Sequence, residues 1–438
     1  MTTLVVGGGW AGLAAAITLT QHHHAVTLIE ASRQLGGRAR AVNINGRELD
    51  NGQHLVIGAY RHFLDYLRIL DVGEQDIFER LPMRLVLREL SGTTRTLRAA
   101  NLPAPWHLLV ALMRAEGFTR AEKRAAIGFC IRLVWRKFHC NSALTVAQLL
   151  AQSAQPPALI YALWEPLCVA TLNTPIAVAS AQVFLRVLRD SFMYRASDSD
   201  ALIPRRTIGD WFANPATRYL NRHHVPLLMN TRVTDLIIDN NVIQGVITND
   251  GKQYSAHNVI VAIPPNASAT LMRNHPALQT IAQQLAHIPY EPIVTVYLRY
   301  NADISTDFPM LGVLGAATQW VFDRRYTGDQ GIISVVISAA SQFRDESNAL
   351  LGNQVANELA QLFPAWPRPQ AINIIREKRA TFLCTPQVQT LRSKTNIPIN
   401  GLFLAGDYVT CDYPATLEGA VISGRAAAQQ ILALRSNR

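Results

Sequence analysis

Leu4-Val5-Val6-Gly7-Gly8-Gly9-Trp10-Ala11-Gly12-Leu13-Ala14 is the stretch of this sequence that decides the fold. A short apolar strand runs directly into three glycines with G-x-G-x-x-G spacing, and an alanine-rich helix follows. Gly7 permits a tight turn, Gly9 lets a pyrophosphate approach the backbone, and Gly12 lets the helix pack closely on the strand. The helix N-terminus offers unpaired N–H groups and the positive end of its dipole to phosphates. The stretch therefore predicts a nucleotide-binding β-α-β unit.

The second strand of this unit ends in a carboxylate. Leu28-Ile29-Glu30 places Glu30 about 20 residues beyond the glycines. An acid at this distance accepts hydrogen bonds from the ribose of a bound dinucleotide. Strand, glycines, helix, strand and acid occur together, which favours a nucleotide site over a glycine-rich turn without function. The predicted fold class is α/β, with a Rossmann-like parallel sheet.

Length and composition exclude several classes of protein. With 438 residues, 49% of them hydrophobic, the chain is long enough for two or three structural units and too apolar for global disorder. We expect no signal peptide, because the apolar N-terminus lacks a basic region and a cleavage signature. We expect no membrane-spanning helix, because no apolar run approaches ~18 residues. Five scattered cysteines without a C-x-x-C pair favour a reducing compartment, so we expect a cytoplasmic protein. They are Cys130, Cys140, Cys168, Cys384 and Cys411.

The net charge of +10 is concentrated in one segment. Residues 84–140 contain 11 Lys or Arg and 3 Asp or Glu, an excess of eight positive charges. No nucleic-acid-binding motif accompanies this charge, so nucleic acid is not an expected partner. A solvated basic face and an anionic membrane surface remain as explanations.

A predicted helix inside the basic segment bears on this choice. Thr119 and Glu122 form a capping-box pattern at its start. Apolar and basic side chains follow, so the helix either lies in a membrane interface or packs its apolar stripe into the protein. In the first case the protein is peripheral on the cytoplasmic face of the inner membrane. The stripe is Ile127, Ile131, Val134, Trp135 and Phe138, and the charges are Arg120, Lys123, Arg124, Arg132, Arg136 and Lys137.

The end of the chain carries a second nucleotide-site signal. Phe403-Leu404-Ala405-Gly406-Asp407 is a predicted strand with a carboxylate at its C-terminal end, where ligands bind in open α/β sheets. A helix then begins near Leu417, and its first N–H groups could face an electron-rich ring edge. NAD enzymes rarely need the last strand of the chain to return to the cofactor, so the two motifs together favour FAD.

The order of the predicted elements divides the chain into three parts. Residues 1–80, 201–265 and 395–438 are expected to form a discontinuous FAD-binding domain, with a strand over 225–233. Residues 81–200 are expected to form a mainly helical basic insert, part of the substrate- and membrane-facing region. Residues 266–394 are expected to form a substrate domain with a sheet.

These motifs resemble a known group of flavoproteins. The glycine loop, Glu30, Gly36-Gly37-Arg38, Gly406-Asp407 and Leu417-Glu418-Gly419-Ala420 resemble the amine oxidase and phytoene desaturase superfamily. A narrower resemblance, to the hydroxysqualene dehydroxylases of hopanoid synthesis, covers essentially the whole chain, and its most specific motifs lie in the middle. The segments that carry this narrower resemblance are Asp50-Asn-Gly-Gln-His54, Leu163-Trp-Glu-Pro-Leu-Cys168, Leu172-Asn-Thr-Pro175, Ala179-Ser-Ala-Gln-Val-Phe-Leu-Arg-Val-Leu-Arg189 and Pro414-Ala-Thr-Leu-Glu-Gly-Ala420.

The resemblance implies a cofactor-binding role for the matching residues. The pyrophosphate would lie against Gly9, Trp10, Ala11 and Gly12. The ribose would bind Glu30, the adenine would meet the backbone of Val233, and Arg38 would follow the chain between pyrophosphate and flavin. Asp407 would bind the ribityl chain, and the amides near Leu417 would hold the flavin pyrimidine. The remaining cofactor-binding residues would be Gly7, Ala31, Gly37, Gln53, Gly406 and Thr416.

The implied reaction is reductive removal of an allylic hydroxyl from a C30 isoprenoid alcohol, hydroxysqualene, to give squalene, with hydride from N5 of reduced FAD. Hydroxide is a poor leaving group, so an acid should protonate it inside an apolar, water-free pocket. One candidate acid is His54, whose alternative role is a hydrogen bond to cofactor or backbone. The other is Glu165, which must be paired or have a raised pKa inside the apolar run 159–172. A structural pair with an arginine is its alternative.

Other functions share this fold. An isoprenoid or carotenoid desaturase, or an amine oxidase, would run flavin oxidation, and a lipid-binding escort protein would use the groove without chemistry. The retained Glu30, Asp407 and helix start at Leu417 favour a working flavin site. The electron donor and the oligomeric state do not follow from the resemblance. No metal site is expected, and His22-His23-His24 is interpreted as a solvated loop.

Overall fold

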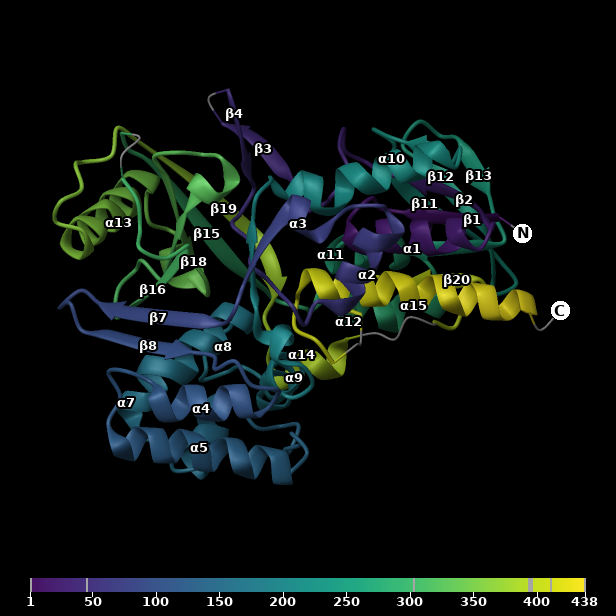
Figure 1. Ribbon diagram of the computed structural model, residues 1–438. Helices are drawn as coiled ribbons and strands as arrows, with labels where there is room; N and C mark the ends of the chain where they lie inside the picture. Colours follow the sequence, from purple (N-terminus) through teal and green to yellow (C-terminus); the bar gives the residue numbers. More distant parts are fainter. Residues whose placement is uncertain (1, 45, 302–303, 393–396, 410–411, 437–438) are drawn as a thin grey trace.

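In the computed structural model, residues 2–44, 46–301, 304–392, 397–409 and 412–436 are described, and Cys411 lies outside them. Two large sheets and a helical region make up the molecule (Figure 1). The elements nearest the two chain ends lie together on the right of the figure, and a seven-stranded sheet lies on the left. Helices α4 (Trp106–Arg114) and α5 (Arg120–Trp135) lie at the bottom.

A five-stranded parallel sheet contains the N-terminal motif. Its order is β10-β2-β1-β14-β20, with every neighbouring pair parallel, so the predicted Rossmann-like arrangement is confirmed. Helix α1 (Trp10–Gln21) packs on this sheet, and α15 (Leu417–Ser436) packs along α1. A Cβ at Gly424 would stand 2.0 Å from the carbonyl oxygen of Ala11, so the helices need glycine there to approach. The strands are β1 (Thr2–Val6), β2 (Ala25–Ile29), β10 (Leu227–Leu228), β14 (Asn258–Val261) and β20 (Leu402–Leu404).

A small antiparallel sheet follows β10. It consists of β11 (Val233–Asp239), β12 (Val242–Thr248) and β13 (Gln253–Ser255). Asn240 and Asn241 form the first turn with positive φ, as an Asn-Asn hairpin loop favours. The single strand predicted over 225–233 is wrong. Asn230 adopts a φ of 54°, which turns the chain out of the parallel sheet before β11 begins.

The seven-stranded sheet has the order β19-β15-β18-β17-β16-β7-β8. Helix α13 (Asn348–Leu362) packs against β15 and β19. Residues 84–98, which we expected within a helical insert, instead form β7 and β8, because β7 pairs in parallel with β16. The strands are β7 (Arg84–Glu89), β8 (Thr94–Arg98), β15 (Tyr290–Arg299), β16 (Met310–Leu314), β17 (Trp320–Asp323), β18 (Ile332–Ile337) and β19 (Ala371–Phe382).

The basic segment continues into the helical region. Thr119 caps helix α5, which begins at Arg120, with both capping-box hydrogen bonds, as predicted. The buried side chains of α5 are Ala126, Phe129 and Leu133. Of the apolar stripe, Ile131 and Trp135 are 51% and 85% exposed, whereas Phe138, just beyond the helix, is buried. The other helices here are α6 (Val146–Gln152), α7 (Pro157–Leu159), α8 (Glu165–Leu172) and α9 (Ala181–Phe192).

Shorter elements complete the described residues. His24 is buried and its ring lies 2.8 Å from the Thr3 hydroxyl, so the prediction of a solvated histidine loop is wrong for this residue. Within the described ranges, no helix combines the length and the apolar character needed to span a bilayer. The remaining strands are β3 (Ala41–Ile44), β4 (Arg47–Asp50), β5 (Val56–Ile57), β6 (Phe78–Leu81) and β9 (Ala201–Pro204). The remaining helices are α2 (Arg61–Ile69), α3 (Glu74–Ile77), α10 (Asn214–Arg222), α11 (Pro265–Met272), α12 (Gln279–Ala286) and α14 (Pro386–Leu391).

Candidate functional site

A cavity of about 1050 Å³ lies where the parallel sheet, the seven-stranded sheet and α9 meet. Residues at or just after the carboxyl ends of β1, β2, β14 and β20 line this cavity, which is the usual ligand position in an open α/β sheet. Gly12, at the strand–helix contact, is not part of this wall. The other predicted cofactor residues all line it: Gly7, Gly9, Trp10, Ala11, Glu30, Ala31, Gly37, Arg38, Gln53, Val233, Gly406, Asp407, Thr416 and Leu417.

The glycine loop has room for a ligand at one position only. A Cβ on Gly12 would stand 1.9 Å from the carbonyl oxygen of Gly7, so protein packing alone requires glycine there. A Cβ on Gly9 would meet only the Cα of Gly37, at 3.9 Å, and Gly9 has ordinary extended backbone. Nothing in the described protein requires glycine at position 9. A pyrophosphate lying against the start of α1 would require glycine there, because a side chain would occupy its place. The loop therefore fits a dinucleotide.

Glu30 is held in place at the end of β2. Its carboxylate accepts hydrogen bonds from the amide of Gly8 at 2.7 Å and from the amide of Ser32 at 2.8 Å. Two backbone donors fix the carboxylate beside the glycine loop, on the cavity wall. A ribose hydroxyl could therefore donate to it without a rearrangement of the side chain.

Arg38 and Asp407 face each other across the cavity wall. The Nη2 of Arg38 donates to Oδ1 of Asp407 at 2.7 Å, and its Nη1 donates to the carbonyl oxygen of Ala380 at 2.9 Å. Arg392, which the sequence did not point to, donates to the carbonyl oxygens of Asp407 and Val409 and so fixes this loop. Arg38, the arginine of the two that lines the cavity, is suited to the negative charge of a pyrophosphate.

The start of α15 closes the same end of the cavity. The hydroxyl of Thr416 accepts a hydrogen bond from the amide of Gly419 at 3.1 Å, so Thr416 caps the helix. Leu417 is the first helical residue and lies on the cavity wall. The first amides of a helix lack partners within the helix, so they can donate to an electron-rich ring edge.

Gln53 is oriented by a buried ion pair. Arg324 donates to Oδ2 of Asp50 at 3.0 Å and to Oε1 of Gln53 at 2.7 Å, and Asp329 also pairs with it. The side chains of Asp50 and Arg324 are each 1% exposed, so the pair has little freedom to move. Arg324 was missed from the sequence because it lies 274 residues from Asp50, with no motif around it.

The two predicted acids have different positions. His54 lines the cavity next to Gln53, and burial together with the charge of Arg38 lowers its pKa despite the opposing effect of Asp50. Glu165 stands at the start of α8 and is not among the lining residues. Burial raises its pKa, and within the described residues it forms no ion pair, so the predicted arginine partner is absent from them.

Beyond the cofactor residues the cavity is mainly apolar. Its wall there comes from β7 and β8, from α8 and α9, and from the strands of the seven-stranded sheet. Such a surface is suited to a long hydrocarbon rather than to a charged amine. The apolar lining residues include Met83, Leu85, Leu97, Leu167, Phe184, Val187, Leu188, Phe192, Leu271, Ile293, Met310, Trp320, Phe322 and Val336.

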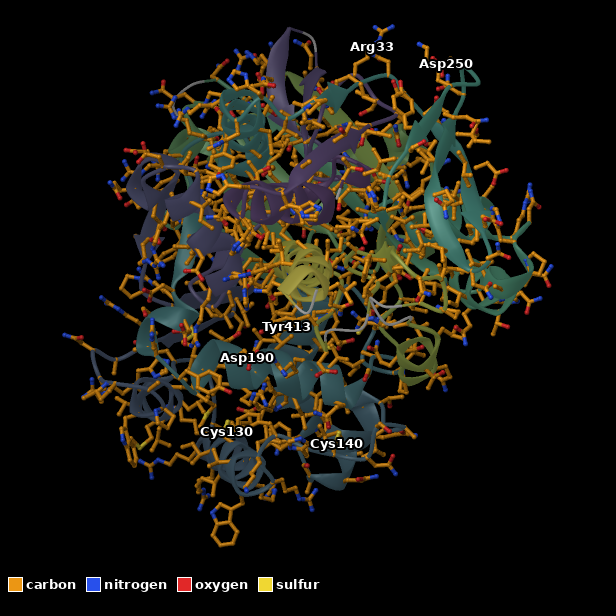
Figure 2. The ribbon with its side chains drawn as sticks, turned by 90° about the vertical axis from the view of Figure 1, so that its right-hand side faces the viewer. Arg33, Cys130, Cys140, Asp190, Asp250 and Tyr413 are labelled. Atoms are coloured by element: carbon orange, nitrogen blue, oxygen red, sulfur yellow. The ribbon has the colours of Figure 1, made fainter. Side chains whose placement is uncertain are left out.

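A hydrogen-bonded polar pair also lies in this wall. The phenol of Tyr413 donates a hydrogen bond to Oδ2 of Asp190, and both residues line the cavity. Figure 2 shows the two side chains close together, between the helical region and α15. Sequence reasoning missed the pair, although Asp190 lies three residues after Val187 and therefore on the same helical face.

Comparisons with known proteins agree with this geometry. A family model described as flavin-containing amine oxidoreductase matches residues 10–432. The hydroxysqualene dehydroxylase of Zymomonas mobilis is 26% identical over 98% of this chain and 99% of its own. The 15-cis-phytoene desaturase of an Oncidium hybrid is 22% identical over 99% of this chain and 78% of its own. Among solved structures, an oxidoreductase from Methanosarcina mazei has a TM-score of 0.76 at 13% identity, over 98% of this chain and 100% of that one.

Proposed function

Because the chain belongs to the family of flavin-containing amine oxidoreductases and is an FAD-dependent oxidoreductase, we propose that it converts hydroxysqualene to squalene. The observation that carries the proposal is the single cavity that runs from the cofactor residues into an apolar chamber. A C30 hydrocarbon with one hydroxyl matches a chamber of this kind. The hydroxysqualene dehydroxylases among the relatives support the same substrate.

The proposed roles of the residues at the cofactor end follow from their positions. Glu30 and Val233 would hold the adenosine half, and the first turn of α1 the pyrophosphate. Arg38, Asp407 and the start of α15 would hold the flavin half. When bound and reduced, FAD supplies a hydride to the substrate carbon that loses its hydroxyl.

The chain itself would supply the proton and exclude water. We propose His54 as the acid that gives its imidazole proton to the departing hydroxyl, ahead of Glu165, because only His54 lines the cavity. A lowered pKa makes the imidazolium a stronger acid but populates it only toward lower pH. The apolar wall would leave the hydride as the sole nucleophile available to the developing allylic cation.

We also propose that α4 and α5 dock on an anionic membrane surface. Trp106 is 57% exposed, Ile131 51% and Trp135 85%, and all three lie within the segment 84–140 that carries the basic excess. Exposed tryptophan beside arginine and lysine is the combination that favours a bilayer interface. A substrate that resides in the bilayer would then need no aqueous transit.

Anaerobic incubation of photoreduced holoprotein with hydroxysqualene tests the reaction directly. We expect the absorbance of the oxidised flavin to return and one squalene to form for each flavin that is reoxidised. No alcohol-dependent reoxidation would overturn the proposal. Reduction of the oxidised protein by a polyene hydrocarbon would support a desaturase instead, and a colourless purified protein that binds no FAD would support a lipid escort.

A further inference from the structure

The polar pair in the apolar wall joins two distant parts of the chain. Asp190 lies near the end of α9, and Tyr413 lies three residues before the cap of α15, where the flavin half is proposed to bind. The Tyr413 hydroxyl and Asp190 Oδ2 are 2.5 Å apart. The pair therefore stands at the boundary between the cofactor end of the cavity and the hydrocarbon chamber.

Asp190 is held as a carboxylate. The Nε of Arg186 donates to its Oδ2 at 2.7 Å, and the Nε of Arg189 donates to its Oδ1 at 2.9 Å. Burial alone would raise the pKa of Asp190, but the hydrogen bonds from Tyr413, Arg186 and Arg189 outweigh it and the pKa is lowered. Burial and the neighbouring Asp190 carboxylate raise the pKa of Tyr413, so its phenol keeps its proton.

This arrangement fixes the direction in which Tyr413 can form a further hydrogen bond. Its one proton is directed to Asp190, and the Arg186 side chain also hydrogen-bonds to the phenol oxygen. Toward a ligand the phenol can therefore act only as an acceptor, through the lone pair that Arg186 leaves free. The part of the cavity wall that α9 contributes includes the apolar Phe184, Leu188 and Phe192 together with Ser191, and Tyr60 lines the cavity as well. An ion pair between Arg186 and Asp412 already connects α9 to the loop before α15. A hydrogen bond that served only to connect these two segments would not need to face the cavity, as the bond between Tyr413 and Asp190 does.

We propose that Tyr413, oriented by Asp190, accepts a hydrogen bond from the substrate hydroxyl and so positions the C–O bond beside the flavin. The inference rests on the proposed function and adds the group that recognises the alcohol. It also explains release, because the hydrocarbon product has no hydroxyl to bind there. Tyr413 touches the substrate in this scheme, and Asp190 is a positioning residue.

Equilibrium binding to the oxidised holoprotein tests this, because the alcohol is not consumed without reduced flavin. We would titrate wild type and Tyr413→Phe with hydroxysqualene and with squalene in matched detergent, following the flavin absorbance. We expect Tyr413→Phe to weaken alcohol binding by about fivefold to tenfold, the effect of one hydrogen bond, and to leave hydrocarbon binding unchanged. Asp190→Asn should weaken alcohol binding in the same direction, because the phenol loses its fixed orientation.

Tyr300→Phe is the matched control, since Tyr300 is buried, packs on Trp366 and does not line the cavity. An equal loss for alcohol and hydrocarbon in Tyr413→Phe, or no loss for either, would overturn the inference. Turnover by the wild type separates the two proposals. If wild type makes squalene and Tyr413→Phe keeps its preference for the alcohol, only the inference fails; if wild type neither converts nor prefers the alcohol, the proposed function fails and the inference with it.

Discussion

Gly9 and Gly12 belong to one loop but lack side chains for different reasons. Gly9→Ala should leave the stability of the apoprotein unchanged and weaken FAD binding by about tenfold or more, because its methyl group occupies the pyrophosphate approach. Gly12→Ala should lower the free energy of unfolding by about 1–3 kcal/mol, because its methyl group overlaps the Gly7 carbonyl. Thermal unfolding of the apoprotein and FAD titration measure the two effects separately.

Gly128→Ala is the control for both changes. Gly128 lies inside α5, and an added Cβ there meets only the flexible end of Arg132, at 3.7 Å. Alanine should therefore stabilise the helix, by about 0.5–1 kcal/mol. A similar loss of stability in Gly9→Ala and Gly12→Ala would contradict the distinction between packing and ligand approach.

His54 leads to a prediction about pH. Because burial lowers its pKa from 6.5, the acid form is lost as pH rises through a value below 6.5. Single-turnover rates of flavin reoxidation by hydroxysqualene should therefore fall from acidic toward neutral pH. His54→Gln should remove this dependence and slow the reaction by about 100-fold or more.

His62→Gln is the matched control for the pH profile. The pKa of His62 is also lowered by burial, but His62 does not line the cavity. Its removal should leave the profile intact. A wild-type rate that stays constant between pH 5 and about 8 would rule out a histidine acid.

At the scale of elements, α5 packs through one face and leaves another uncovered. Trp135→Ala should reduce binding to vesicles containing anionic lipid by about tenfold, because a buried aromatic side chain contributes about 1.5–3 kcal/mol. Leu350→Ala on α13 is the control, since Leu350 is also exposed but lies outside the basic segment. Sedimentation with vesicles at low and high salt measures both; equal binding of the two variants would contradict docking through α5.

At the scale of the molecule, the cofactor residues connect segments that are far apart in the chain. FAD should therefore raise the unfolding temperature of the whole molecule, with a gain of about 2.7 kcal/mol at 100 times its dissociation constant. FMN should raise it much less, because it lacks the adenosine half that Glu30 and Val233 are proposed to hold. Calorimetric scans of the apoprotein with each flavin test this, and an equal shift would exclude an adenosine site.

The parts that could be predicted from the sequence are those with local signals. The glycine loop, the acid at Glu30 and the capping box at Thr119 each occupy a few consecutive residues, and the structure has the corresponding elements. The partners across the cavity could not be found this way. Asp190 and Tyr413 are 223 residues apart, and their meeting depends on how α9 packs against the loop before α15.

Strand assignment failed where long-range pairing decided it. The charge of residues 84–98 suggested the surface of a helical insert, but pairing with β16 makes them strands. For α5 the sequence left two alternatives open, with the apolar stripe either in a membrane interface or packed into the protein. Its apolar residues exceed what the packing can bury, and periodicity alone does not tell which of them remain outside.

The parallel sheet combines β1, its central strand, with β20, which lies near residue 404, and this has a consequence for biosynthesis. β1 is translated long before β20, the strand two places away in the sheet, which ends at residue 404. At roughly 5–20 residues per second this interval lasts tens of seconds. During that time the nascent chain has an open sheet edge and an unfinished flavin site. Because the end of β20 and the start of α15 line the cavity, the flavin site can be completed only after α15 has been released from the ribosome.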